Sequence, residues 1–117
     1  MIIRGGHNIH PAHIEEYAHR HPRVKKAAAF GVADERLGEK VCLAVIAQDG
    51  PPGAEELLEH LAGEGLSRFD MPEYFVVVQE FPLTASGKIL KRELVQWVSN
   101  GRLQPEPVRY RAPATAK

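Results

Sequence analysis

The sequence is short of cysteine, since Cys42 is the only one among 117 residues. A disulfide within the chain is therefore impossible, and this cysteine usage fits a reducing compartment. The neighbours of Cys42 in the run KVCLAVIA are apolar and strand-like. We therefore expect Cys42 to be a buried, unreactive side chain rather than a nucleophile.

Long hydrophobic runs are also missing. No apolar stretch approaches the roughly 18 residues that a membrane helix needs. The N-terminus does not carry the long apolar core of a signal peptide. These absences predict a soluble, cytoplasmic protein with no membrane partner.

The chain has no net charge, because 15 basic residues balance 15 acidic residues. A dedicated nucleic-acid binder or membrane-surface binder relies on a basic excess for its phosphate contacts, so both classes are disfavoured. The balance still allows a local basic cluster that holds one anionic ligand.

The N-terminal segment is rich in histidine, but we expect no metal site there. Histidines at spacings of three share a face only if all lie on one helix, and Pro11 separates His7 and His10 from His13. Zinc usually takes four ligands that neighbouring groups hold in place. The histidines expected on a solvated helix face are His10, His13, His19 and His21.

What is present suffices for one small α+β domain. Apolar residues at helical spacing predict helices from Pro11 to before Pro22, over 55–61, and over 90–98. β-Branched and apolar runs predict strands over 27–32, 41–47 and 75–78. The expected fold is a small sheet of about three strands, mainly antiparallel, packed with helices. Residues 1–100 would form the domain, and the prolines that follow predict a flexible tail over 101–117.

Two details of the first segment allow further expectations. Gly5-Gly6 permits either a sharp turn that a ligand can approach closely or merely a turn before a helix. Glu15 and Glu16 are expected to stabilise the positive N-terminal end of the first helix.

The segment FPLTASGKILKREL, residues 81–94, carries Lys88 directly after a glycine on a short polar loop. A phosphate-binding loop needs glycine where Pro82 stands and a hydroxyl residue where Ile89 stands, so such a loop is not expected. Two alternatives stay open. Lys88 is either an ordinary solvated lysine or a cation that meets a phosphate or carboxylate presented by another domain.

Three segments occur in a recognisable order: MIIRGGHNIHPAHIEE, FGVADERLGEKVCLAVI and MPEYFVVVQEFPLTASGKILKREL. Together they resemble the C-terminal domain of the AMP-forming acyl-CoA synthetases, over about residues 1–98. The resemblance implies a mobile lid that works with a large N-terminal adenylation domain. In the full-length enzyme a carboxylic acid attacks the α-phosphate of ATP, and the thiol of coenzyme A then displaces AMP.

The resemblance also implies roles for particular residues. Lys88, with Ser86 and Gly87 in the pattern P-x-x-x-x-G-K, would enter the active site during adenylation. The equivalent lysine of the family is a frequent acetylation target, so Lys88 is an expected modification site. A second group of residues would line the pantetheine tunnel for coenzyme A, namely Gly5, Gly6, His7 and Asn8.

The resemblance implies that ATP, AMP and Mg²⁺ are held by the N-terminal domain, so this chain alone is expected to bind no cofactor and to be inactive. The family's hinge residue is missing before Met1, so the chain is expected to be cut at the hinge. Many relatives carry a lysine where Asp70 precedes Met71. Candidate partners for the 3′-phosphate of coenzyme A are Arg4, Arg36, Arg68, Lys91 and Arg92. The competing hypothesis is a stand-alone, non-catalytic module that binds coenzyme A or a partner subunit.

Overall fold

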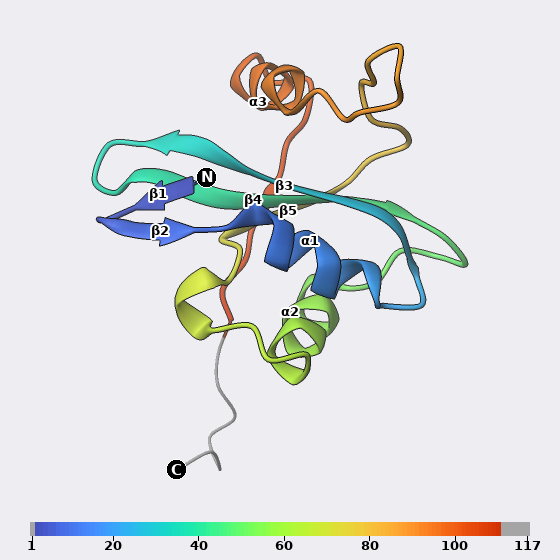
Figure 1. Cartoon of the computed structure of the whole chain (residues 1–117), viewed down its shortest axis with the longest axis horizontal. Coiled ribbons are helices and arrows are strands. Elements are labelled where there is room, and N and C mark those ends of the chain that lie inside the picture. Colours follow the sequence, from blue (N-terminus) through green and yellow to red (C-terminus); the bar gives the residue numbers. More distant parts are fainter. Residues whose placement is uncertain (1, 111–117) are drawn as a thin grey trace.

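The computed structural model describes residues 2–110 as one mixed sheet with helices on both faces (Figure 1). The elements are, in order, β1 (Ile2–Arg4), β2 (His7–Ile9), α1 (Pro11–His19), β3 (Val24–Asp34), β4 (Gly38–Ala47), α2 (Ala54–Gly63), the short 3₁₀ helix η1 (Arg68–Asp70), β5 (Tyr74–Val77), α3 (Lys91–Ser99) and β6 (Glu106–Pro107).

The sheet has six strands rather than about three, and it is mixed rather than mainly antiparallel. Adjacent strands follow the order β2-β1-β4-β5-β6, and β3 also pairs with β4. The predicted strands 27–32 and 41–47 lie within β3 and β4, and the predicted strand 75–78 overlaps β5. The additional strands β1, β2 and β6 span only two or three residues each, which is too short for a periodic sequence pattern. The parallel pairing of β4 with β5 follows because α2 and η1 carry the chain back across the sheet.

Strand β4 forms the centre of the domain. Its residues 41–45 are all buried, and successive side chains point to opposite faces of the sheet. Val41, Leu43 and Val45 enter one core, whereas Cys42 and Ala44 enter the other. A strand buried on both faces reads as a continuous apolar run, which explains the unbroken pattern of this segment.

The two cores lie on opposite faces of the sheet. Helices α1 and α2 cover one face and α3 covers the other, as Figure 1 shows below and above the sheet. Helix α1 contributes Ile14 and Ala18 to its core, and α3 contributes Leu94, its single fully buried residue. Trp97 is half-buried beside this second core, with the Arg102 guanidinium 4.0 Å from its ring centre.

The three predicted helices correspond to α1, α2 and α3, but the role expected for Glu15 and Glu16 is wrong. Neither residue lies in the first turn of α1. Glu15 instead accepts a 2.8 Å hydrogen bond from the Ala29 amide of β3 and lies 2.6 Å from the Lys91 ammonium at the start of α3. Glu16 pairs with Arg20 one turn later on the same helix.

The predicted tail begins in contact with the sheet. Within residues 101–110, β6 pairs with β5, and the Val108 amide donates to the Glu73 carbonyl. Val108 and Tyr110 pack against the core beneath α1 and α2. The flexibility expected for 101–117 stays a prediction, and residues 111–117 lie outside the described part.

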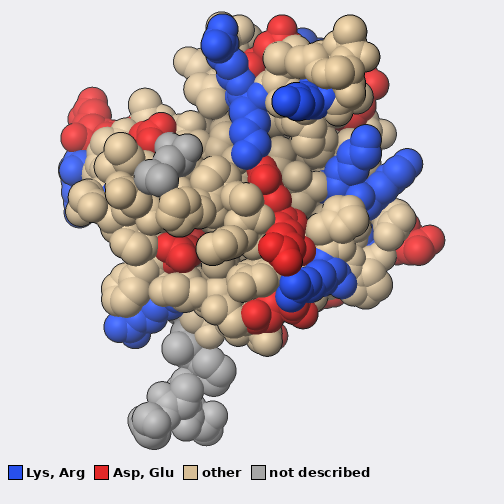
Figure 2. Space-filling model, in the orientation of Figure 1, with Lys and Arg blue, Asp and Glu red and all other residues tan. Residues whose placement is uncertain are grey.

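Acidic and basic side chains alternate over the face seen in Figure 2, without one continuous basic area. This distribution agrees with the zero net charge of the chain. Across residues 2–110, none of the helices has both the length and the apolar character that spanning a membrane requires.

We expect Leu94→Ala to lower the free energy of unfolding by about 2–5 kcal/mol, because Leu94 is the fully buried residue that joins α3 to the sheet. Leu83→Ala is the matched control, since Leu83 is 46% exposed and its loss is expected to cost at most about 0.5 kcal/mol. Urea denaturation followed by circular dichroism measures both. Equal losses in the two variants would contradict this account of how α3 is held.

Candidate functional site

The lysine loop, residues 82–90, is an ordered structure closed by its own hydrogen bonds. Thr84 is its organising residue: its amide donates to the Lys88 carbonyl at 2.8 Å, and its hydroxyl accepts from the Lys88 amide at 3.0 Å. The Gly87 amide donates to the Thr84 carbonyl at 2.9 Å, and the Leu90 amide donates to the Pro82 carbonyl at 2.8 Å. The backbone of Lys88 is therefore fixed from both sides.

Gly87 and Ser86 have local roles in this loop. Gly87 has φ of +90°, a left-handed conformation that glycine adopts without steric cost. The Ser86 hydroxyl lies 3.0 Å from that of Thr84, so both hydroxyls are engaged within the loop. The sequence GK thus reflects turn geometry, with the glycine directing the chain so that the next side chain points outward.

The Lys88 side chain is exposed, and among residues 2–110 no carboxylate lies within 4.0 Å of its ammonium. A fixed backbone with a free cationic end suits contact with an anionic group outside this domain. The neighbouring Lys91 differs, because its ammonium is held by Glu15.

The glycine segment is the two-residue loop of a β-hairpin. Strands β1 and β2 pair with Arg4 opposite His7, which leaves Gly5 and Gly6 as the turn. Their φ values are +56° and +85°, as a type I′ hairpin turn requires at both central positions. A Cβ at Gly6 would meet nothing within 4 Å, so the outer side of the turn is open.

The hairpin is held from one side by the turn between β3 and β4. The Gly5 amide donates to the Leu37 carbonyl at 2.8 Å. Asp34 fixes that turn, since its carboxylate accepts from the amides of Arg36 and Leu37. The hydrogen bond from the Leu37 amide holds the pKa of the Asp34 carboxyl below its ordinary value, so the group stays charged near neutral pH.

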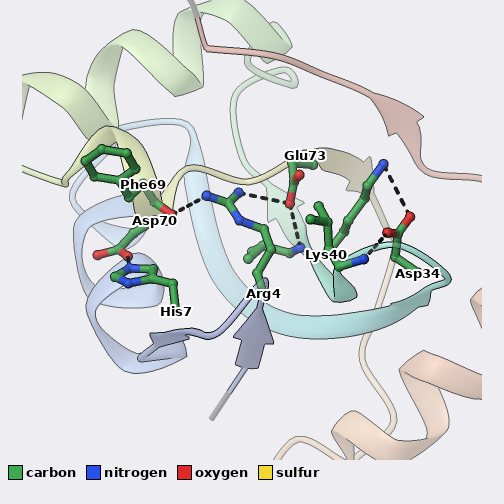
Figure 3. Close-up of polar contacts among 9 residues, drawn as sticks. Arg4, His7, Asp34, Lys40, Phe69, Asp70 and Glu73 are labelled. Atoms are coloured by element: carbon green, nitrogen blue, oxygen red, sulfur yellow. Dashed lines mark hydrogen bonds and ion pairs between the residues drawn. The ribbon is translucent and has the colours of Figure 1, made fainter.

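On its other side the hairpin meets η1 and the start of β5 (Figure 3). Arg4 donates to the Phe69 carbonyl at 2.5 Å and lies 3.1 Å from the Glu73 carboxylate. His7 lies 2.7 Å from the Asp70 carboxylate. Asn8 is exposed and pairs with Ile3 in the hairpin register.

The two predicted groups lie far apart in the domain. In Figure 1 the β1–β2 turn lies at the left of the sheet, whereas the lysine loop extends at the upper right, near α3. The structure brings Gly5, Gly6, His7 and Asn8 together, and it brings Ser86, Gly87 and Lys88 together. It does not bring the two groups to one site.

The five basic candidates for a phosphate contact divide by their partners. Arg4 and Lys91 are already paired within the domain. Arg36 and Arg68 are exposed and lie on segments that contact the hairpin, the latter with its guanidinium 5.2 Å from the Phe69 ring centre. Arg92 is exposed on α3, away from the hairpin.

Sequence reasoning did not find the residues that hold the hairpin. Asp34 and Glu73 were not singled out, and Asp70 was noted only for standing where relatives carry lysine. Asp34 contacts amides two and three residues away, which is a local turn, whereas Asp70 and Glu73 have partners on the hairpin 63 and 69 residues away. No short motif encodes the two long-range contacts, because they form only when η1 and β5 are packed beside the hairpin.

Comparisons with known proteins agree with this geometry. Residues 13–88 match the family model of the AMP-binding enzyme C-terminal domain. The chain belongs to this family. The mitochondrial medium-chain acyl-CoA ligase ACSF2 of Rattus norvegicus is 44% identical over 94 residues, which are 80% of this chain and 15% of that protein.

Solved structures agree with the family. This AMP-binding C-terminal domain superposes on a fatty acyl CoA synthetase of Mycobacterium tuberculosis with a TM-score of 0.79 and 33% identity, covering 86% of this chain and 20% of that one. It superposes on the o-succinylbenzoate CoA synthetase of Bacillus subtilis, solved with an acyl-adenylate intermediate, with a TM-score of 0.73 and 33% identity, covering 80% and 19%. The chain thus spans about a fifth or less of these relatives.

The geometry of the described residues supports neither a metal site nor a nucleophilic role for Cys42. Within the described residues, no group of three or more histidine, cysteine or acidic side chains could hold a metal ion. Cys42 is fully buried, and burial raises the pKa of its thiol to about 12.

We expect the Cys42 thiol of the folded chain to resist alkylation at pH 8, since only about 10⁻⁴ of it is thiolate at that pH. Iodoacetamide labelling followed by intact mass gives the rate. The same chain in denaturant, where the thiol has its ordinary pKa, is the control and is expected to react fully. Rapid labelling of the folded chain would show that the thiol is accessible.

Proposed function

We propose that this chain is the mobile lid of an AMP-forming acid–thiol ligase. The lid supplies Lys88 for adenylation and the β1–β2 turn for the coenzyme A step. The observation that carries the proposal is the exposed ammonium of Lys88, which no carboxylate of residues 2–110 pairs, on a hydrogen-bonded loop. The acyl-CoA ligases among its relatives give the chemical context.

Adenylation concentrates negative charge around the α-phosphate of ATP as the carboxylate attacks. An ammonium placed there stabilises the transition state more than the ground state, which lowers the barrier. Lys88 suits this role because its backbone is held by Thr84 while its side chain is free to extend. The nucleotide, the Mg²⁺ and the acid would be held by the large N-terminal domain.

Thioester formation needs a narrow path for the pantetheine arm. The Gly5-Gly6 turn offers backbone without side chains, with open space outside Gly6. His7 and Asn8 are exposed beside it and would form polar walls of the path. Arg36 and Arg68 lie on neighbouring segments and are the candidates for the 3′-phosphate.

The separation of the two groups supports a lid that works in two poses. A rigid domain with Lys88 at one end and the hairpin at the other presents only one of them to a shared active site at a time. Rotation between the half-reactions would then withdraw the lysine and bring in the hairpin. Lys88 could thus assist the first step without obstructing the second.

The acid substrate is not encoded in this domain. The relatives are named for medium-chain acids, fatty acids and o-succinylbenzoate, and all share this C-terminal fold. The choice of acid therefore belongs to the N-terminal domain. The cytoplasmic location expected from the sequence stays a prediction, since the rat relative is named as mitochondrial.

In the full-length ligase we expect Lys88→Ala to slow adenylation by about 10²–10³-fold, because a charge aimed at the transition state is lost. Acid-dependent exchange of pyrophosphate into ATP measures this step. Thioester formation from a supplied acyl-adenylate is expected to keep its rate. Lys26→Ala, at an exposed lysine of β3, is the matched control for both assays. An equal loss in both half-reactions would reject the role of Lys88.

Gly6→Leu tests the second pose. We expect thioester formation to fall by about 10²-fold or more, because the added side chain occupies the pantetheine path. A displacement of the reacting thiol by about 1 Å is enough for a rate loss of about 10²-fold. Pyrophosphate exchange is expected to change little. Gly50→Leu is the matched control, since Gly50 also has a positive φ, +90°, and open space around it. Unchanged coenzyme A turnover in the Gly6 variant would exclude the hairpin from the path.

A further inference from the structure

The tip of the β1–β2 hairpin needs support from outside itself. Each strand has only three residues, and a hairpin of this length is not stable alone in water. Ile2 and Ile9 anchor its base in the core. Strand β1 meets β4 at a single registered pair, Arg4 with Gly38. The direction of the tip therefore depends on a few contacts.

Segment 67–72 provides a firm support on one side of the tip. The Ser67 hydroxyl accepts from the Phe69 amide, and the Asp70 amide donates to the Ser67 carbonyl at 2.9 Å. Met71 and Pro72, directly after Asp70, are buried. Asp70 is thus fixed in its backbone, and its side chain is only 24% exposed.

Two side chains of the hairpin reach this support, as Figure 3 shows. Arg4 binds the Phe69 carbonyl within this segment and the carboxylate of Glu73, the residue that follows it, so it joins β1 to both places. His7 reaches Asp70 at 2.7 Å, although its own side chain is 49% exposed. Arg4 acts at the end of β1, whereas the His7–Asp70 contact holds the first residue after the glycine turn.

We propose that Asp70 is a positioning residue for the coenzyme A step: it holds His7 and thereby directs the glycine turn toward the pantetheine arm. This inference rests on the function proposed above. Asp70 itself would not touch the ligand. The hydrogen-bonded pair would restrict the turn to one orientation, which lowers the conformational cost of admitting the thin chain.

The direction in which the KM for coenzyme A changes when Asp70 is removed distinguishes a positioning role from charge repulsion. Coenzyme A is a polyanion, so removing a nearby carboxylate lowers its KM if charge repulsion alone is at work. Loss of positioning raises the KM instead. A partly exposed, charge-assisted contact of this kind corresponds to about a threefold to tenfold effect.

The test uses the full-length ligase with Asp70→Ala, assayed in both half-reactions. We expect the KM for coenzyme A to rise about threefold to tenfold, while pyrophosphate exchange is unchanged. Glu59→Ala, at an exposed carboxylate of α2, is the control and is expected to leave both assays unchanged. In a His7→Ala background, Asp70→Ala is expected to have no further effect, because Asp70 acts through His7.

Three results would overturn the inference: a KM that is unchanged or lower, an equal loss in pyrophosphate exchange, or a KM rise that persists without His7. A different result, that of the Gly6→Leu variant, decides the function proposed above. If Gly6→Leu leaves the coenzyme A step intact, the hairpin does not line the path. If Gly6→Leu blocks that step and Asp70→Ala does not affect it, only the positioning role of Asp70 is wrong.

Discussion

The double burial of strand β4 is the constraint on which the rest of the domain depends. Its side chains fill cores on both faces of the sheet, and its edges pair with β3, β1 and β5. Such a strand cannot shift by one residue without exchanging the side chains of the two cores. The β1–β2 hairpin, one of the two candidate sites, is attached to this fixed strand. The turn before β4 holds Gly5 through Leu37, and the Val41 amide of β4 holds Glu73, which in turn binds Arg4.

The two candidate groups solve different physical problems. In the proposed function Lys88 enters the active site of another domain, which needs a fixed backbone and a free side-chain end, and the loop around Thr84 has both. The proposed path for a thin ligand needs backbone that can turn sharply without a side chain, and Gly5 and Gly6 are two successive residues with positive φ. Each arrangement is local, so the domain can carry the two at opposite ends (Figure 1).

Several charged side chains of this domain connect its own segments. The described carboxylates of Glu15, Asp70 and Glu73 each join two segments that are distant in the sequence. Arg4 looks in the sequence like a free phosphate partner, but it is bound to a carbonyl and a carboxylate of its own domain. Lys88 differs from these residues because its cation is directed outward. Zero net charge therefore conceals a division between charged groups that hold the domain together and exposed cations such as Lys88.

The sequence by itself determined the local features. Apolar periodicity gave the three α-helices and the long strands, the pattern P-x-x-x-x-G-K marked the lysine loop, and Gly5-Gly6 marked a turn, because each depends on residues that are neighbours in the chain. Only the tertiary structure decided the number of strands, the parallel pairing of β4 with β5, and the partners of Arg4, His7 and Glu15. These features depend on contacts between segments far apart in the sequence, and strands of two or three residues carry too little pattern to be seen before the sheet assembles around them.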